Sequence, residues 1–247
     1  MLSKKWNYGD AYLRHPIVEN KIAIFDNGSI VKVHDIFNPL PDFMKAADVL
    51  FIDPPWNLGN LNTFYMKANK SERHKSFEIF YMRLFECIAA ISPKSCYVEV
   101  GKMYLSEFIQ EMKKLYKYVT FYNSSYYHRK ENICYIIHGG RKKQKLPLDY
   151  VDEEDAIMWV CEKEEYDCIG DLCMGQGLVG VNAYKNGKRF VGTELNHKRL
   201  AVLLDRISNL GGSYELVNIS PSRPANQPTT ASYRVSVQDI QHDYKQP

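Results

Sequence analysis

The chain has 247 residues, of which 45% are hydrophobic and 25% are charged, and its formal net charge is +3; this length allows one domain with a substantial core, and so small a charge does not by itself indicate nucleic-acid binding. No apolar run approaches the ~18 residues of a membrane-spanning helix, and residues 1–20 lack the apolar centre of a signal peptide, so we expect a soluble cytoplasmic protein. Six cysteines without Cys-x-x-Cys or matching histidine spacing argue against a metal site and a disulfide framework, and predict reduced, mostly buried thiols.

The first half of the chain alternates predicted strands with predicted helices. Residues 21–25 and 29–34 are expected to form a hairpin, because the turn signal Asp26-Asn27-Gly28 separates them. The segments that follow are a short helix at 41–47, a strand at 48–52, a long polar loop at 57–75, a helix at 77–91, a strand at 95–100 and a helix at 104–116. Two more strands, at 119–127 and 132–137, flank a turn at 128–131.

The second half continues this alternation. The predicted elements are a strand at 167–173, a helix at 178–185, a strand at 189–193, and a helix that is capped by Asn196 and ends at Ile207. Such an order predicts an α/β fold, with a mixed but mostly parallel sheet and helices on both faces. We expect residues 1–219 to form one domain, and the tail at 220–247, rich in Pro, Ser, Thr and Gln, to be disordered or loosely docked.

The tetrapeptide Asp53-Pro54-Pro55-Trp56 directly follows the apolar strand at 48–52. Two consecutive prolines fix φ and remove two N–H donors, which leaves carbonyl groups free to face a ligand. The Asp53 carboxylate and the Pro54 carbonyl can then accept from one NH₂ group and point its lone pair at an electrophile, while Trp56 offers a face for a stacked base. A proline-terminated strand beside a core tryptophan would give the same residues.

A second constellation follows the predicted strand at 167–173. Glycines in the segment Met174-Gly175-Gln176-Gly177 allow a close backbone approach to a ligand, and the helix that begins there supplies free N–H groups. Glu194 ends the next strand, where a carboxylate commonly accepts from ribose hydroxyls. The order is that of half a dinucleotide-type fold, although a glycine-bearing loop and a surface glutamate would look alike.

Together these segments resemble the amino-group methyltransferases that use S-adenosylmethionine, in the permuted (beta-class) order where the catalytic motif precedes the cofactor motif. Family members carry Asp-Pro-Pro-Tyr/Phe/Trp first, and later Asp-Pro-Phe-x-Gly-x-Gly followed by Gly-x-Glu. The counterparts here are residues 53–56, 171–177 and 192–196, and the resemblance spans roughly residues 28–210. Leu172 and Cys173 stand where the family usually has proline and an aromatic residue.

The resemblance implies a Rossmann-like methyltransferase fold, S-adenosylmethionine as the cofactor, no metal, and methyl transfer to N6 of adenine in DNA. Its implied catalytic residues are Asp53, Pro54, Pro55 and Trp56. Its implied cofactor-binding residues are Asp35, Asp53, Asp171, Cys173, Met174, Gly175, Gln176, Gly177, Glu194, Leu195 and Asn196. In this scheme the pair His34-Asp35 lies beside the adenine of the cofactor, although a solvated loop would explain that pair equally well.

Two loops carry the basic residues expected to bind nucleic acid. They are Lys67, Lys70, Arg73 and Lys75 after the tetrapeptide, and Arg141, Lys142, Lys143 and Lys145 after Gly139-Gly140. If both loops flank the catalytic pocket, they would neutralise phosphates, with the acids at 152–155 and 162–165 outside the groove. A target in duplex DNA would have to be flipped out, and a single strand would present it directly. Ordinary solvated lysines are the alternative explanation.

Three other functions fit the same motifs. Messenger-RNA adenine methyltransferases also carry Asp-Pro-Pro-Trp, and cytosine-N4 enzymes share the fold but more often have serine at the first position. A non-catalytic nucleic-acid-binding subunit of the same fold usually lacks the acid or the glycines, which are both present here. Relatives in this family are often homodimers, and act in restriction-modification or in phage-infected bacterial cells.

Overall fold

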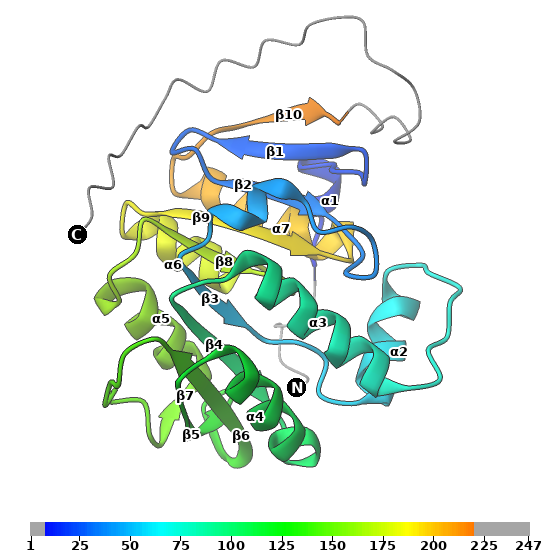
Figure 1. The fold of residues 1–247 in the computed structure, drawn as a ribbon. Coiled ribbons are helices and arrows are strands. Elements are labelled where there is room, and N and C mark those ends of the chain that lie inside the picture. Colours follow the sequence, from blue (N-terminus) through cyan, green and yellow to red (C-terminus); the bar gives the residue numbers. More distant parts are fainter. Residues whose placement is uncertain (1–7, 220–247) are drawn as a thin grey trace, which may run out of the picture.

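The computed structural model describes residues 8–219, and its strands form one ten-stranded sheet. The strands are β1 (Lys21–Phe25), β2 (Ile30–Val33), β3 (Val49–Ile52), β4 (Ser95–Val100), β5 (Tyr118–Tyr126), β6 (Arg129–Gly140), β7 (Val151–Asp152), β8 (Cys168–Asp171), β9 (Arg189–Glu194) and β10 (Tyr214–Asn218). Their order across the sheet is β10-β1-β2-β9-β8-β3-β4-β6-β5-β7. The strands from β2 to β4 in this order are mutually parallel, so their carboxyl ends share one edge of the sheet (Figure 1).

Helices cover both faces of the sheet (Figure 1). They are α1 (Ala11–Arg14), α2 (Leu58–Lys67), α3 (Phe77–Ile91), α4 (Leu105–Leu115), α5 (Glu153–Lys163), α6 (Leu178–Lys185) and α7 (His197–Asn209), with short 3-10 helices η2 (Asp42–Ala46) and η3 (Lys102–Tyr104). One apolar cluster joins Phe51 to α5, α6 and α7, and a second joins Leu50 to α2, α3, α4 and η2. Neighbouring residues of β3 therefore serve opposite faces, as the alternation of a strand requires.

Strand β3 is the best example of how the sequence determines the sheet. Its four residues are all buried, and an uninterrupted apolar run is what a parallel strand covered on both faces needs. The predicted strands at 21–25 and 95–100 and the predicted helices at 77–91 and 178–185 are confirmed residue for residue. Asn196 caps α7 as predicted, since its side-chain oxygen accepts from the Lys198 amide at 2.9 Å.

The prediction of a long loop at 57–75 is wrong for its first half, which forms α2. The side chain of Asn57 accepts from the Asn60 amide at 2.9 Å and caps this helix. Leu61 and Tyr65, four residues apart, bury one face of the helix, while its asparagines and glycine lower the helix propensity that the sequence displays. The expected tail at 220–247 lies outside the described residues.

The structure also contains elements that the sequence pattern did not indicate. Helix α5 and the short strand β7 precede β8, and β10 pairs antiparallel with β1 at the edge of the sheet. No helix within residues 8–219 is long and apolar enough to cross a membrane. The same residues contain no group of His, Cys, Asp and Glu side chains arranged to hold a metal ion.

Candidate active site

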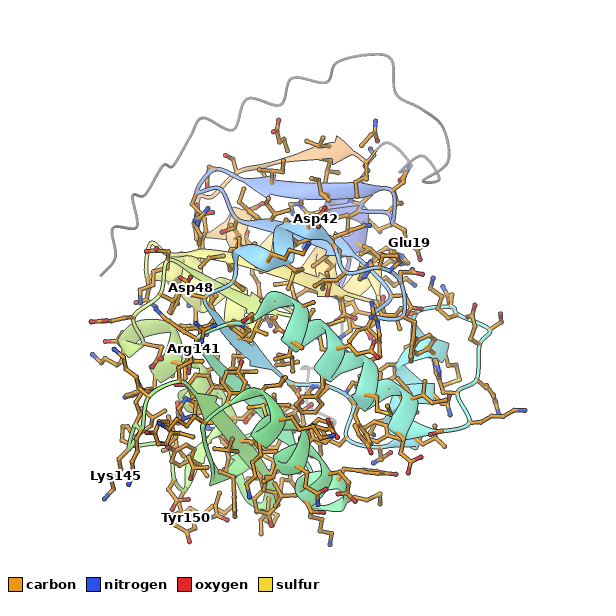
Figure 2. The ribbon with its side chains drawn as sticks, viewed as in Figure 1. Glu19, Asp42, Asp48, Arg141, Lys145 and Tyr150 are labelled. Carbon is orange, nitrogen blue, oxygen red and sulfur yellow. The ribbon has the colours of Figure 1, made fainter. Side chains whose placement is uncertain are left out.

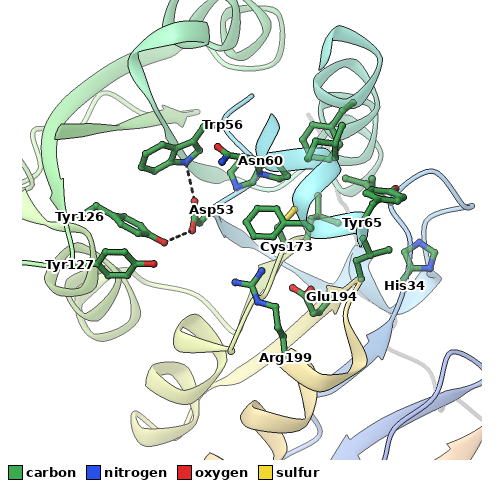
Figure 3. Close-up of a pocket in the computed structure, with 18 residues that line it drawn as sticks. His34, Asp53, Trp56, Asn60, Tyr65, Tyr126, Tyr127, Cys173, Glu194 and Arg199 are labelled. Atoms are coloured by element: carbon green, nitrogen blue, oxygen red, sulfur yellow. Dashed lines mark hydrogen bonds between the residues drawn. The ribbon is translucent and has the colours of Figure 1, made fainter. Parts of the chain in front are cut away.

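The candidate site lies at the edge of the sheet where the parallel strands end. Asp53 follows β3, the glycine turn at 174–177 follows β8, and Glu194 ends β9, so the topology joins segments that are far apart in sequence. Two adjoining cavities open there, with volumes of about 220 and 560 Å³. The residues that line both cavities are Asp53, Tyr126, Tyr127, Cys173 and Arg199 (Figure 3).

The Asp53 carboxylate is held by two side chains from different elements. Trp56 Nε1 donates to Asp53 Oδ1 at 3.1 Å, and the Tyr126 hydroxyl donates to Asp53 Oδ2 at 3.4 Å (Figure 3). Burial raises the pKa of Asp53 to about 6, and the positive charge of Arg199 and these two hydrogen bonds oppose that rise. Because each oxygen has two lone pairs and accepts one bond, the carboxylate can accept further bonds from a ligand.

The three residues after Asp53 all line the smaller cavity. The Trp56 ring meets the Tyr126 ring edge-on, with 5.3 Å between centroids. A Cβ at Gly101 would lie 2.9 Å from Trp56 Cε3, so the indole packs directly against a bare backbone. The tryptophan therefore has a fixed position beside the carboxylate.

The smaller cavity is mostly apolar. Besides Asp53 to Trp56, its walls include His34, Ile36, Leu61, Phe64, Tyr65, Phe80, Leu172, Glu194 and Leu195. Asp35 is not among the described residues that line either cavity, although its neighbours His34 and Ile36 are in the wall of the smaller one. Asp35 Oδ1 accepts from the Tyr65 hydroxyl at 2.6 Å and fixes that ring in the wall.

Glu194 is buried, and both of its oxygens accept backbone N–H groups. Oε2 accepts from Gly175 at 2.6 Å and Oε1 from Asn196 at 2.9 Å. The glycine turn and the start of α7 are therefore attached to one carboxylate, which keeps a free lone pair on each oxygen. Asn196 does not line either cavity in the described part of the chain. Its side-chain Nδ2 donates to the Lys67 carbonyl at 3.1 Å, which links the end of α2 to the start of α7.

The glycine turn forms part of the larger cavity. Asp171, Met174, Gly175 and Gln176 line it, and Asp171 Oδ1 accepts from the Cys173 amide at 2.9 Å. Gly177 has φ +76°, and a Cβ there would lie 2.6 Å from Leu203 Cβ. The positive φ and the close packing against α7 both require glycine at this position. Gly177 is not among the described residues that line either cavity.

Arg199 is a site residue that the sequence analysis missed. It projects from α7 into the space between Asp53 and Glu194 (Figure 3). Its guanidinium lies over the Phe64 ring, 5.1 Å from the centroid, and its Nη2 would be 2.8 Å from a Cβ at Gly175. Nε is buried without a hydrogen-bonding partner among residues 8–219. The signal in the sequence is a single arginine beside the apolar face of α7, one turn after the Asn196 cap.

Tyr126 and Tyr127 are two more site residues that the sequence did not indicate, because they lie at the end of a hairpin. The turn residues Tyr127 and His128 have φ +61° and +52°, the left-handed values of a tight hairpin turn that usually carries Asn or Gly. Backbone amides of this turn donate to the acids at the start of α5, Tyr127 to Glu153 at 3.2 Å and His128 to Asp152 at 2.6 Å. These bonds hold both tyrosines against Asp53.

Acidic side chains line the larger cavity, which corrects the expectation that the acids at 152–155 lie outside the groove. Glu153 and Glu154 at the start of α5 and Glu99 of β4 are all in its wall. Burial, and next the hydrogen bond that its protonated form donates to Asp152, raise the pKa of Glu153 to about 8. The cavity therefore joins Asp53 to the carboxyl group of Glu153, which is protonated near neutral pH.

The first basic loop continues from α2, the helix that supplies Leu61 and Tyr65 to the wall of the smaller cavity. Lys70 pairs with Glu19 at 2.7 Å, and Arg73 and Lys75 are exposed. None of the four predicted residues, Lys67, Lys70, Arg73 and Lys75, is among the described residues that line either cavity, so their binding of nucleic acid stays a prediction.

The second basic loop is at the opposite edge of the sheet, so its expected place beside the pocket is wrong. Strand β6 runs antiparallel to β4, and Gly140 at its end pairs with Ser95 at the start of β4. The Arg141 guanidinium donates to the Ser92 carbonyl at 2.9 Å, and Lys142, Lys143 and Lys145 follow it on the surface (Figure 2). Asp53 lies beyond the other end of the neighbouring strand β3.

No protein-family model matches the sequence, and no curated protein matches it. The structure is similar to that of TTHA0409 from Thermus thermophilus, provisionally named a DNA modification methylase, with 15% identity over 72% of this chain and 94% of that chain and a TM-score of 0.51. The fold is the α/β Rossmann-like fold of methyltransferases. This confirms the predicted fold class. M1.HpyAVI has 15% identity over 72% of this chain and 98% of that chain, with a TM-score of 0.49. PvuII DNA methyltransferase, which is cytosine-N4-specific, has 11% identity over 70% of this chain and 84% of that chain, with a TM-score of 0.46.

Proposed function

We propose that the protein is an S-adenosylmethionine-dependent methyltransferase that modifies the N6 amino group of adenine in DNA. The observation that carries this proposal is the single site shared by Asp53, with its open lone pairs, and by the glycine turn and Glu194. Acceptors for an amine and a cradle for a nucleoside are thereby brought together.

The residues present fit such a cofactor. The apolar walls of the smaller cavity suit a flat heterocycle, and the free lone pairs of Glu194 suit ribose hydroxyls. On the other side of the glycine turn, the Asp171 carboxyl can accept from an ammonium group. The buried Arg199 guanidinium, whose Nε has no partner in residues 8–219, can bind a carboxylate. When bound, S-adenosylmethionine supplies an electrophilic methyl group.

Asp53 and the Pro54 carbonyl would orient the target amine. An exocyclic amine is a weak nucleophile because its lone pair is conjugated with the ring, and two acceptors on one side turn that lone pair out of conjugation. Transfer would form one N–C bond while the S–C bond to the methyl group breaks and its electron pair stays on sulfur. The nitrogen would then lose one of its two protons, which ionised Asp53 can accept and pass to water. Trp56 and the edge of Tyr126 bound the space for the ring.

DNA is the proposed substrate because α2, which lines this site, continues into a basic loop whose Arg73 and Lys75 are exposed and could bind phosphates. Adenine is proposed because the tetrapeptide begins with aspartate. The amino group of cytosine and adenine in RNA present the same chemistry to Asp53, so both belong in the test.

The test measures tritiated methyl transfer from S-adenosylmethionine to duplex DNA, single-stranded DNA and RNA, followed by digestion of the product to nucleosides. We expect N6-methyldeoxyadenosine from the DNA products and no label in the RNA. If the product is methylated at N4 of cytosine, or if only RNA is labelled, the substrate is cytosine or RNA instead of adenine in DNA. If none of the three nucleic acids is labelled, the proposed function is refuted.

A further inference from the structure

Glu99 is a buried carboxyl group with no assigned role. It has zero relative exposure, and neither oxygen accepts from an N–H or O–H group within residues 8–219; a weak donor, the Cys134 thiol, faces it. Leaving such a group unsatisfied in a core is costly, and a sheet strand could carry an apolar residue at this position. Because Glu99 lines the larger cavity, its oxygens are available to a ligand there.

The register of the sheet places Glu99 beside Asp53. Ile52 of β3 pairs with Val98 of β4, so Asp53 and Glu99 are the next residues along two adjacent parallel strands. Two residues before Asp53 and Glu99, Phe51 and Tyr97 stack with 5.8 Å between ring centroids, and alternate residues of a strand share a face. Both carboxyl groups therefore emerge on the same face, over that stacked pair, and into one cavity.

Acidic groups around Glu99 favour its neutral form, namely Asp53 after β3 and Asp152 and Glu153 at the start of α5. The Cys134 thiol of β6 donates to the carboxyl group and acts in the opposite sense, as does the positive charge of Arg199 on α7; Tyr126 of β5 also lines this cavity. Burial, and next the charges of Asp53 and Glu153, raise the pKa of Glu99 well above its ordinary value. A neutral carboxylic acid can donate a hydrogen bond, which a carboxylate cannot.

We propose that protonated Glu99 donates a hydrogen bond to the ring nitrogen adjacent to the target amino group, which is N1 when the base is adenine. This inference rests on the proposed function and specifies how the same site recognises its base. Asp53 accepts from the amino group while Glu99 donates to its neighbouring ring atom. The two carboxyl groups thus read an edge that has a donor and an acceptor side by side.

This pair of groups selects a substrate class. Adenine and cytosine both have an amino group next to an unprotonated ring nitrogen, whereas the equivalent edge positions, C6 and N1 of guanine and C4 and N3 of thymine, present a carbonyl oxygen next to an N–H group. With those bases Asp53 would face an acceptor and Glu99 would face a donor, so both buried groups would remain unpaired. Sites of this kind discriminate strongly, because an unpaired buried polar group is costly.

The experiment compares adenine with 1-deazaadenine, which lacks N1, at the modified position of a duplex oligonucleotide. The enzymes are the wild type, Glu99→Gln, which keeps a donor, and Glu99→Leu, which removes it. The quantity compared is the ratio of kcat/KM for adenine to kcat/KM for 1-deazaadenine. We expect this ratio to be about tenfold larger for the wild type and for Glu99→Gln than for Glu99→Leu. Any intrinsic change in amine reactivity affects all three enzymes and cancels in the comparison. If the modified base is cytosine, 3-deazacytosine takes the place of 1-deazaadenine.

A matched control is Glu164→Gln, because Glu164 is a buried glutamate that accepts from Tyr97 at 3.3 Å but is outside both described cavities. It should keep the wild-type ratio. Thermal unfolding should show that Glu99→Leu folds, since an unsatisfied carboxyl is exchanged for an apolar side chain.

The pH profile gives a second readout that a merely structural role would not change. Transfer by the wild type should fall at alkaline pH as Glu99 ionises, and Glu99→Gln should lack this alkaline fall. The inference is overturned if Glu99→Leu keeps the wild-type preference for adenine over 1-deazaadenine. A wild type that methylates no nucleic acid would instead refute the proposed function itself.

Discussion

Glu194 is the last residue of β9 and Glu99 the next-to-last residue of β4 in the same sheet, and both are buried, with relative exposures of 6% and 0%. Glu194 accepts two backbone N–H groups, whereas Glu99 accepts from no N–H or O–H group in the described residues. The β8–β9 side of the site is thus already ordered by its own hydrogen bonds, and the β3–β4 side keeps groups whose bonding is incomplete. Under the proposed function, the β8–β9 side would hold the cofactor and the β3–β4 side would act on the base.

The largest effect is expected on the β3–β4 side. Asp53→Ala removes the acceptor of the target amine, and we expect methyl transfer to fall by about 100-fold or more. Cofactor binding, measured by calorimetry, should change little. Asp42→Ala is the matched control, because the Asp42 side chain is 92% exposed on η2. Equal turnover by Asp53→Ala and wild type would remove the proposed role of Asp53.

On the β8–β9 side, Glu194→Ala should act on binding. It deletes the bonds to ribose hydroxyls and leaves the amides of Gly175 and Asn196 without their acceptor. We expect the dissociation constant for S-adenosylmethionine to rise about 10- to 100-fold, as charged hydrogen bonds of this kind contribute. Glu215→Ala, on the exposed edge strand β10, is the control. Unchanged calorimetric affinity would show that the ribose contact is elsewhere.

The packing of the glycine turn against α7 can be tested by a pair of alanine substitutions. Gly177 and Gly187 both have positive φ, +76° and +67°, but only at Gly177 would a Cβ collide, 2.6 Å from Leu203; at Gly187 nothing in the described chain is within 4 Å. Both variants should therefore suffer backbone strain. Gly177→Ala should lose a further ~2 kcal/mol of unfolding free energy from overpacking, measured in urea. If the two variants lose equal unfolding free energy, α7 can shift to accommodate the added methyl group at residue 177.

The smallest expected effect is on the pH dependence of transfer, and it concerns Arg199, which lines both cavities. The positive charge of Arg199 lowers the pKa of Asp53 against the larger effect of burial, which raises it to about 6. Transfer requires ionised Asp53, so wild-type activity should be lost as the pH falls through about 6. Arg199→Met removes the opposing charge, raises the pKa of Asp53 further, and should move this acid limb to higher pH. Lys198→Met, which removes a charge from the same helix where it lies over Tyr12, should leave the limb in place. An unmoved limb in Arg199→Met would show that its charge does not reach Asp53.

The sequence predicts those parts of the site that are fixed by local order along the chain. Asp53 and Glu194 each follow an apolar run, and the ends of parallel strands meet by topology alone. Helix α2 was missed because asparagine and glycine weaken its propensity while packing on α3 and β3 decides its state. Its place over the smaller cavity could not be read from its composition.

Other parts depend on contacts between segments that no local pattern records. Glu99 looks like one polar residue in a strand until the register places it next to Asp53. Arg199 looks like an ordinary helix residue until α7 packs over the glycine turn. The loop at 141–145 was misplaced because β6 runs antiparallel to β4, and this reversal sends its end away from Asp53.

The strand order has a consequence for how the protein is made. Strands β8 and β9 stand between β2 and β3 in the sheet, yet both leave the ribosome long after them. A nascent chain that stops before residue 168 has the two flanks of its sheet and lacks the middle. Maturation must therefore wait for late insertion of the central strands, and truncated translation products will expose unpaired strand edges.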